Sequence, residues 1–244
     1  MDLYTAMIRM IEELAKLKLP IVFKGAMVLS QILENDGTEM LRTTKDIDGN
    51  WVSEPPSMDE LTFYVQKAAS RVDKEYSVDA FREYGVGKSA GFKIKHLQNE
   101  KLDFSIDISI GENKGAIAYI TGVNGVTYYA SSPVKMAADK INSVSSRRVY
   151  RRAKDMLDLY QLTYVFGFNT YEIIKLTDGK LEQFNQFRLN YDNIKHAYDM
   201  LTVAQEKPDF DIVYERLNIF LEPFIEYGYD VENLDWNGES WTKK

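Results

Sequence analysis

The chain contains no cysteine and only two histidines among its 244 residues. The absence of cysteine excludes disulfide bonds, thiolate nucleophiles and zinc sites built on cysteine. The two histidines, His96 and His196, lie far apart in the sequence. We therefore expect neither a histidine-rich metal centre nor a catalytic triad that depends on histidine.

Long apolar runs and a positive net charge are also missing. No apolar run approaches the roughly 20 residues that a membrane-spanning helix needs, so we expect no contact with a membrane. Residues 1–19 are amphipathic and include acidic side chains, which fits neither a secretory signal nor a transit peptide, and we expect a cytoplasmic protein. The net charge of −7 predicts no general attraction to nucleic acid, so an RNA contact would need a local basic patch.

What is present is an ordinary globular composition, with 45% hydrophobic and 27% charged residues, in a chain long enough for two small domains. Residues 1–131 mix strand and helix patterns, whereas the pattern after residue 131 is helical. We predict an α+β fold, with a mixed β-sheet core and flanking helices in residues 1–131 and an all-helical domain in residues 132–244. The polar stretch 228–244 is expected to be a loosely docked tail.

Individual elements follow from the same patterns and from turn residues. The predicted strands are 21–23, 46–52, 78–84, 90–97, 102–110, 116–120 and 126–129, with hairpin turns at 98–101 and 122–125. The predicted helices are 2–17, 27–33, 58–72, 133–144, 147–166, 170–178, 190–206 and 209–226.

Two carboxylates open one predicted strand, in the sequence Asp46-Ile47-Asp48. Residues i and i+2 of a strand share a face, so both carboxylates point to the same side. This suits Mg²⁺, which prefers oxygen ligands and binds through a few carboxylates plus substrate phosphates. Two ions roughly 3.5–4 Å apart could activate an attacking hydroxyl and hold a departing pyrophosphate. The tripeptide alone says little, because Asp209-Phe210-Asp211 repeats it at the start of the predicted helix 209–226.

Context separates the first pair of carboxylates from the second. The first follows a strand–glycine–helix turn at Lys24-Gly25-Ala26, where glycine lets the backbone approach a phosphate and the helix N–H groups face the anion. A simple tight turn is the alternative. A third carboxylate comes from the alternating strand 102–110, where we prefer Asp107 to Asp103 because it lies deeper in the strand. A half-exposed edge strand would show the same alternation.

Basic residues gather in the predicted helix 147–166, and Lys140 lies on the helix before it. Helical spacing would place Arg148, Arg151, Arg152, Asp155 and Asp158 on or near one face of the second helix. A local excess of arginine in an acidic protein could hold a triphosphate or an RNA backbone. The alternative is a solvated face tied by Arg–Asp pairs.

Taken in order, these motifs resemble the AbiEii-type toxin family of nucleotidyltransferases, within the DNA polymerase β-like superfamily. The resemblance covers residues 21–162, and the helical remainder fits less specifically. The matching residues are Phe23-Lys24-Gly25, Arg42-x-Thr44-x-Asp46-Ile47-Asp48, the strand with Asp107, Lys140, and Arg151-Arg152-x-Lys154-Asp155-x-x-Asp158-Leu159.

The resemblance implies a nucleotidyltransferase core, a nucleoside triphosphate substrate and Mg²⁺. It also implies the toxin half of a toxin–antitoxin or abortive-infection pair, hence a cognate antitoxin as partner, and some family members modify transfer RNA. Asp46 and Asp48 match the family's metal ligands. Lys140 and Asp155 or Asp158 match later motifs, which are implicated in nucleotide binding and catalysis.

One position departs from the family, which usually shows a second glycine and then serine or threonine where this chain has Ala26 and Met27. Because the Met27 side chain cannot donate a hydrogen bond, backbone N–H groups would have to contact the phosphate, helped by Lys24 or Lys45. The departure supports an alternative hypothesis, in which the chain is a nucleotide- or antitoxin-binding module that has lost catalysis.

Our leading prediction is an Mg²⁺-dependent transfer of a nucleoside monophosphate from a nucleoside triphosphate to an acceptor hydroxyl, in RNA or transfer RNA. Small-molecule transfer, as in antibiotic-modifying enzymes, is a further alternative, although the arginines favour a larger polyanionic acceptor. The predicted metal ligands are Asp46, Asp48 and Asp107, and the predicted nucleotide-binding residues are Lys24, Gly25, Ala26, Lys45, Arg151 and Arg152. Lys140 is expected to neutralise the triphosphate. Asp155 or Asp158 is expected to orient basic groups or to complete the catalytic site.

Overall fold

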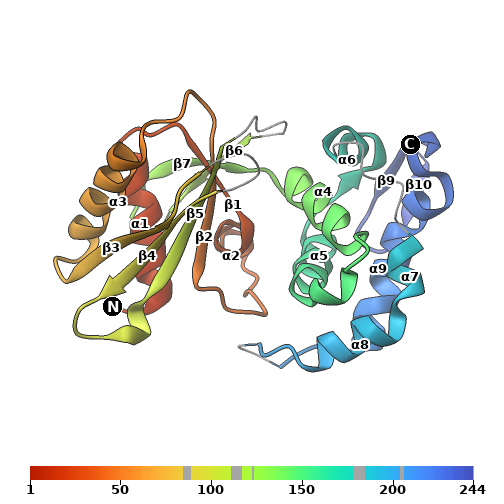
Figure 1. Ribbon diagram of the computed structural model, residues 1–244. Coiled ribbons are helices and arrows are strands. Elements are labelled where there is room, and N and C mark those ends of the chain that lie inside the picture. The colour runs from red at the N-terminus through yellow and green to blue at the C-terminus, as the bar shows by residue number, and fades with distance from the viewer. Residues whose placement is uncertain (85–88, 111–116, 123, 178–184, 204–205, 244) are drawn as a thin grey trace. The chain divides into compact units, whose positions relative to one another are not determined.

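The computed structural model describes residues 1–84, 89–110, 117–122, 124–177, 185–203 and 206–243. It divides into two compact units (Figure 1). Unit 1 comprises Met1–Asn35 and Thr44–Ser131, and unit 2 comprises Asp36–Thr43 and Ser132–Lys244. Parts of the predicted strand 116–120, turn 122–125 and helices 170–178 and 190–206 lie outside the described residues. Within the described part of the chain, no helix is both long and apolar enough to cross a membrane.

Unit 1 is built on a mixed sheet of seven described strands in the order β3-β4-β5-β2-β1-β7-β6. Two pairs, β2 with β5 and β1 with β7, are parallel, and the other neighbours are antiparallel. The prediction of an α+β fold with a mixed sheet is therefore confirmed. The strands are β1 (Ile21–Lys24), β2 (Asp46–Trp51), β3 (Tyr76–Arg82), β4 (Ala90–His96), β5 (Phe104–Ile110), β6 (Ile117–Thr121) and β7 (Thr127–Ser131).

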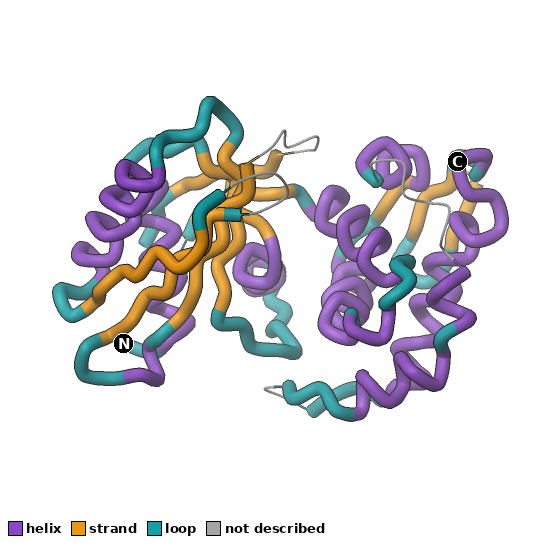
Figure 2. Tube along the Cα trace, in the orientation of Figure 1, coloured by secondary structure: helices purple, strands orange, loops and turns teal. Residues whose placement is uncertain are grey.

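Three helices flank this sheet, namely α1 (Leu3–Lys16), α2 (Gly25–Asn35) and α3 (Met58–Val72). Helices α1 and α3 pack side by side against one face (Figures 1 and 2). The bounds of α3 are those predicted, because Ser57 and Glu60 form a capping box that fixes its first turn.

Alternation along the central strands separates a buried face from an open one. In β5, Phe104, Ile106 and Ile108 are buried, whereas the intervening Ser105 and Asp107 are partly exposed. Strand β2 repeats the pattern, with Ile47 buried between two aspartates. The apolar side chains join the core under α1 and α3, and the polar ones line the opposite face of the sheet.

Unit 2 is largely helical, as predicted. Its helices are α4 (Pro133–Val144), α5 (Ala153–Val165), α6 (Thr170–Leu176), α7 (Asn185–Leu189), α8 (Tyr191–Asp199) and α9 (Phe210–Tyr227). It also contains a small sheet that the sequence did not predict, in the order β10-β9-β8. Its strands are β8 (Phe168–Asn169), β9 (Leu234–Trp236) and β10 (Trp241–Lys243).

The prediction of a loosely docked tail is wrong. Trp236 is only 2% exposed, and its indole N–H donates a 2.8 Å hydrogen bond to the Thr163 carbonyl. The Trp241 ring stacks on Phe220 with 5.2 Å between ring centroids. These aromatic contacts bury much apolar area and hold the C-terminal strands on α5 and α9.

The predicted helix 147–166 is also shorter than expected. Helix α5 begins at Ala153, and Val149–Arg151 form a separate 3₁₀ turn. Val149 is fully buried, so tertiary packing fixes a tight turn where the sequence favours helix. Arg148, Arg151 and Arg152 consequently precede α5 and do not share a helical face with its aspartates.

Candidate active site

A row of residues crosses the open face of the unit 1 sheet at one level. Strand register pairs Lys24 with Asp48, Asp48 with Asp107, Asp107 with Gly91 and Gly91 with Arg82. We call these five residues the charged row. Paired residues of neighbouring strands project from the same face, about 5 Å apart. The row therefore sets two carboxylates side by side between two cationic residues, on five adjacent strands.

Gly25 touches the carboxylate at the centre of this row. Its φ of 75° lies in the left-handed region, and an added Cβ would overlap the Asp48 carboxylate, whose Cγ would lie 3.2 Å away. Glycine is required here for both reasons. Because Gly25 also begins α2, the turn brings the first N–H groups of that helix beside Asp48. Ala26 and Met27 are buried, so a phosphate at this turn would meet backbone rather than their side chains.

Asp107 forms an ion pair with Arg82, a residue that the sequence analysis did not single out. Arg82 also donates hydrogen bonds to the carbonyl and the hydroxyl of Ser89, at 2.8 and 2.7 Å. A register shift between Ala80 and Arg82 marks a β-bulge at the end of β3. The bulge turns Arg82 towards Asp107 across the small Gly91, and no local sequence signal predicts this.

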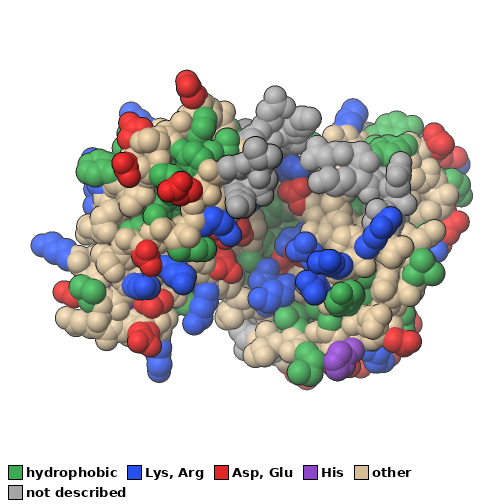
Figure 3. Space-filling model, in the orientation of Figure 1, with side chains coloured by type: hydrophobic (Ala, Val, Ile, Leu, Met, Phe, Trp, Pro, Cys, Tyr) green, Lys and Arg blue, Asp and Glu red, His purple; other side chains and the backbone are tan. Residues whose placement is uncertain are grey.

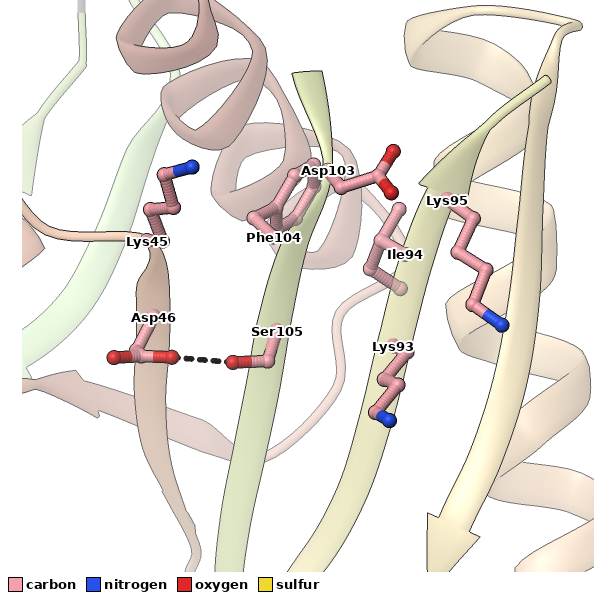
Figure 4. Close-up of a pocket in the computed structure, with 8 residues that line it drawn as sticks. All are labelled: Lys45, Asp46, Lys93, Ile94, Lys95, Asp103, Phe104 and Ser105. Carbon is pink, nitrogen blue, oxygen red and sulfur yellow. Dashed lines mark hydrogen bonds between the residues drawn. The ribbon is translucent and has the colours of Figure 1, made fainter. Parts of the chain in front are cut away.

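Asp46 lies two residues before Asp48 on β2, on the same face of the strand. Its carboxylate accepts a hydrogen bond from the Ser105 hydroxyl. It lines a shallow depression of about 270 Å³ on the same sheet. Figure 4 shows the other lining residues, which are Lys45, Lys93, Ile94, Lys95, Asp103, Phe104 and Ser105. Lys45, Lys93 and Lys95 thus line the same depression as Asp46.

The donor chemistry of these carboxylates suits a hard divalent cation. Asp46, Asp48 and Asp107 come from two adjacent strands and share the open face. Among residues that the structure describes, no group of three or more acidic or histidine side chains could hold a metal by itself. Mg²⁺ usually takes one or two protein carboxylates and completes its shell with phosphates and water. The residues therefore fit a cation that is bound together with a triphosphate.

The later predicted residues meet in a second cluster, which lies within unit 2. The Lys140 ammonium lies 2.6 Å from carboxylate oxygens of both Asp155 and Asp158. Arg42 binds Asp158 with two hydrogen bonds, of 2.6 and 2.8 Å. Asp158 is completely buried, and Arg42 is only 9% exposed. The structure thus joins Lys140, Asp155 and Asp158 and adds Arg42 from the short segment Asp36–Thr43 of the same unit.

Charge within this cluster is balanced between two cations and two carboxylates. Burial would raise the pKa of Asp158, but the charge of Lys140 and the hydrogen bonds of Arg42 outweigh burial and hold that pKa below its ordinary value of 3.8. Burial would lower the pKa of Lys140, but Asp158 and Asp155 raise it above 10.5. Asp158 and Lys140 are therefore charged near neutral pH, and the buried Asp158 carboxylate has both Lys140 and Arg42 as partners.

Predicted basic residues line the surface of unit 2 just before and at the start of α5. Lysine and arginine side chains gather on the helical unit in Figure 3. The basic residues of segment 147–154 are all exposed, namely Arg147, Arg148, Arg151, Arg152 and Lys154. Arg151 lies over the ring of Tyr150, at 5.8 Å from its centroid, and Arg152 approaches Asp155 at 3.9 Å. This segment carries five cationic side chains and no acidic one.

Solved structures with a similar fold include a bacterial toxin. MenT4, a nucleotidyltransferase toxin from Mycobacterium tuberculosis, superposes with a TM-score of 0.53 at 18% sequence identity. The match covers 73% of this chain and 63% of the MenT4 chain. At this identity the likeness concerns the fold alone.

Comparison of the sequence itself is more specific. No curated protein sequence matches the chain significantly. The profile of one family, described as "Nucleotidyl transferase AbiEii toxin, Type IV TA system", matches residues 9–226. This range includes the charged row and the cluster around Asp158. The chain therefore belongs to the AbiEii nucleotidyltransferase toxin family.

Proposed function

We propose that this protein transfers a nucleoside monophosphate from a nucleoside triphosphate to an acceptor hydroxyl in RNA, including transfer RNA, and releases pyrophosphate. In the reaction, a bond forms between the acceptor oxygen and the α-phosphorus while the bond between the α-phosphorus and the leaving pyrophosphate breaks. As a family member, the protein would act as the toxin of a bacterial toxin–antitoxin pair, with a cognate antitoxin as its partner.

The charged row is the observation that carries this proposal. Asp48 and Asp107 are register partners on parallel strands, and Gly25 packs against Asp48. Asp46, Asp48 and Asp107 would hold magnesium ions, which supply positive charge to the triphosphate when bound. The Gly25 turn offers backbone N–H groups to a phosphate, and Lys24 and Arg82 place positive charge at either end of the row.

The exposed basic segment 147–154 supports a polyanionic acceptor. Its five cations form a local patch on a protein of net charge −7, as RNA backbone binding would require. Lys140 is held by Asp155 and Asp158, so we assign it and Asp158 to positioning within unit 2.

Label transfer tests the proposal directly. Each of the four α-labelled nucleoside triphosphates is incubated with the protein, Mg²⁺ and total RNA, and one nucleotide is expected to label RNA. Asp48→Asn should reduce the rate at least about 100-fold, because loss of a ligand exceeds the 10- to 100-fold cost of changing a residue that supports one. Asp211→Asn changes the second Asp-x-Asp sequence at an exposed position of α9 and should leave the rate unchanged.

Two results would count against nucleotidyl transfer. One is the absence of label in RNA with every nucleotide while a known nucleotidyltransferase labels the same RNA. The other is an Asp48→Asn variant as active as the wild type. Binding of triphosphate without turnover would instead favour the module that has lost catalysis.

A further inference from the structure

Phe81 is an aromatic side chain on the polar face of the unit 1 sheet. It is 46% exposed and belongs to the β-bulge at the end of β3. The ring rests on Gly91, where an added Cβ would lie 2.7 Å from its Cζ atom. Because Gly91 is a member of the charged row, the ring of Phe81 lies on the open face, beside Asp107 and Arg82.

Two cations lie close to the Phe81 ring. The guanidinium carbon of Arg82 and the ammonium of Lys93 each lie 5.4 Å from the ring centroid. An isolated exposed ring is common on protein surfaces. A ring seated on glycine, with two cations over it at cation–π distance, combines aromatic surface and positive charge at one point of the open face.

Positive charge continues from Phe81 along the sheet. Lys93 and Lys95 lie on β4 and Lys45 precedes β2, and all three line the depression of Figure 4. The carboxylates there are engaged, since Asp46 accepts from Ser105 and Asp103 accepts a 2.8 Å hydrogen bond from the His96 backbone N–H. Lys95 also lies 3.5 Å from Asp79, at an exposed position.

These features match the chemistry that binds single-stranded nucleic acid, in which bases stack on aromatic rings and phosphates follow a line of cations. From Gly91 to Lys95 the strand advances about 13 Å at 3.3 Å per residue. A charge line of this length, beside the row that would take the triphosphate, suits an extended polyanion. We propose that the open face of β3, β4, β5 and β2 binds the single-stranded RNA acceptor, with a base stacked on Phe81 and phosphates on Lys93, Lys95 and Lys45.

The role of this RNA as acceptor rests on the proposed function, but its binding can be measured without turnover. The test uses full-length protein carrying Asp48→Asn and a fluorescent single-stranded oligoribonucleotide of mixed sequence, without nucleotide or metal. Fluorescence anisotropy should show that Phe81→Ala weakens binding roughly 5- to 100-fold, the effect of losing one stacked base. Phe81→Trp should bind at least as tightly as the parent, because the larger ring stacks better.

Phe63→Ala is the matched control. Phe63 lies on α3, is 62% exposed and has Lys67 at 5.8 Å from its ring centroid, so it repeats the local chemistry away from the open face. The Phe63→Ala variant should bind the oligoribonucleotide with the same affinity as the parent. The double change Lys93→Gln and Lys95→Gln should lower the slope of log affinity against log salt by about 1.4, at roughly 0.7 per phosphate of a single strand.

The proposal is overturned if Phe81→Ala binds within twofold of the parent, or if Phe63→Ala weakens binding equally. If the wild-type protein labels RNA and Phe81→Ala leaves the KM for RNA unchanged, the open face is not the RNA-binding surface, but the proposed function stands. If binding depends on Phe81 but no nucleotide is ever transferred, the surface stands and the proposed function falls.

Discussion

Gly25 and Gly37 carry nearly the same backbone conformation, with φ of 75° and 79°, but they differ in their surroundings. A Cβ at Gly37 would meet nothing within 4 Å, whereas one at Gly25 would overlap the Asp48 carboxylate. The backbone cost of alanine in this region is about 1–2 kcal/mol at either position. Alanine at Gly37 should therefore cause backbone strain alone, whereas alanine at Gly25 should cause the same strain and also displace Asp48.

We expect Gly25→Ala to lower the free energy of unfolding by more than Gly37→Ala and to abolish nucleotide transfer, because the new methyl group must push Asp48 aside. Gly37→Ala should cost about 1–2 kcal/mol and leave transfer intact. Chemical denaturation and the label-transfer assay measure the two effects. Equal loss of activity in both variants would refute the idea that Gly25 acts through Asp48.

Single residues also show where sequence reasoning ends. The strand pattern predicts that Asp46 and Asp48 share one face of their strand and that Asp107 lies on the polar face of its own, since alternation depends only on period two. Arg82 could not be predicted, because its contact with Asp107 requires a bulge and a glycine on the strand between. Arg42 was recognised as part of a motif, but its partner Asp158 lies 116 residues later, beyond any local pattern.

At the scale of elements, helix boundaries were predicted well where a local signal defines them. Helix α3 starts after the Ser57 capping box, and α4 starts after Ser132 with proline in its first turn. Prediction failed where distant packing decides, as for the turn that precedes α5 and for the C-terminal strands. Trp236 carries no local signal for a strand that pairs with β8.

The ion cluster that ties α4 to α5 should make stability depend on pH. Because the folded pKa of Asp158 lies below 3.8, its contribution is complete above that value and is lost as pH falls through the folded pKa. Asp158→Asn leaves buried cations short of a partner and should cost about 3–5 kcal/mol at pH 7. Denaturation from pH 8 to pH 3 should show this difference constant above about pH 5 and shrinking below pH 4.

Glu232→Gln provides the control for this pH series. Glu232 pairs with Lys243 at 2.8 Å, and both side chains are exposed. The change should therefore cost only about 0–1 kcal/mol. A pH-independent difference between wild type and Asp158→Asn across the whole range would show that Asp158 is not a charged partner in the folded protein.

The C-terminal strands should contribute strongly to the stability of unit 2. We expect Trp236→Ala to lower the free energy of unfolding by about 3–5 kcal/mol, through lost packing and the unmade bond to Thr163. Tyr229→Ala, at a side chain that is 51% exposed, should change it by less than about 1 kcal/mol. Thermal melts of both variants provide the measurement, and equal melting temperatures would contradict firm docking of these strands.

At the scale of the whole molecule, the chain leaves unit 1 after Asn35, contributes eight residues to unit 2, and returns at Thr44. Arg42→Ala should therefore destabilise unit 2 by about 3–5 kcal/mol, because it removes an ion-pair partner from the buried Asp158 carboxylate. Hydrogen exchange read by mass spectrometry should show faster exchange in α4 and α5, while β2 and β5 keep their protection.

Lys45→Ala, an exposed change three positions along the chain but within unit 1, should leave exchange in both helices unchanged. Faster exchange concentrated in β2 after Arg42→Ala would mean that the segment Asp36–Thr43 belongs energetically to the sheet instead.

The excursion of Asp36–Thr43 has a consequence for biosynthesis. Arg42 leaves the ribosome 116 residues before Asp158. At about 5–20 residues per second, translation takes roughly 6–23 s to supply that carboxylate. During this delay the strands on both sides of the segment can already emerge. The segment between them then lacks Asp158, the partner of Arg42. A nascent chain halted near residue 131 would thus expose this link to chaperones and proteases, and slower translation should lengthen that exposure.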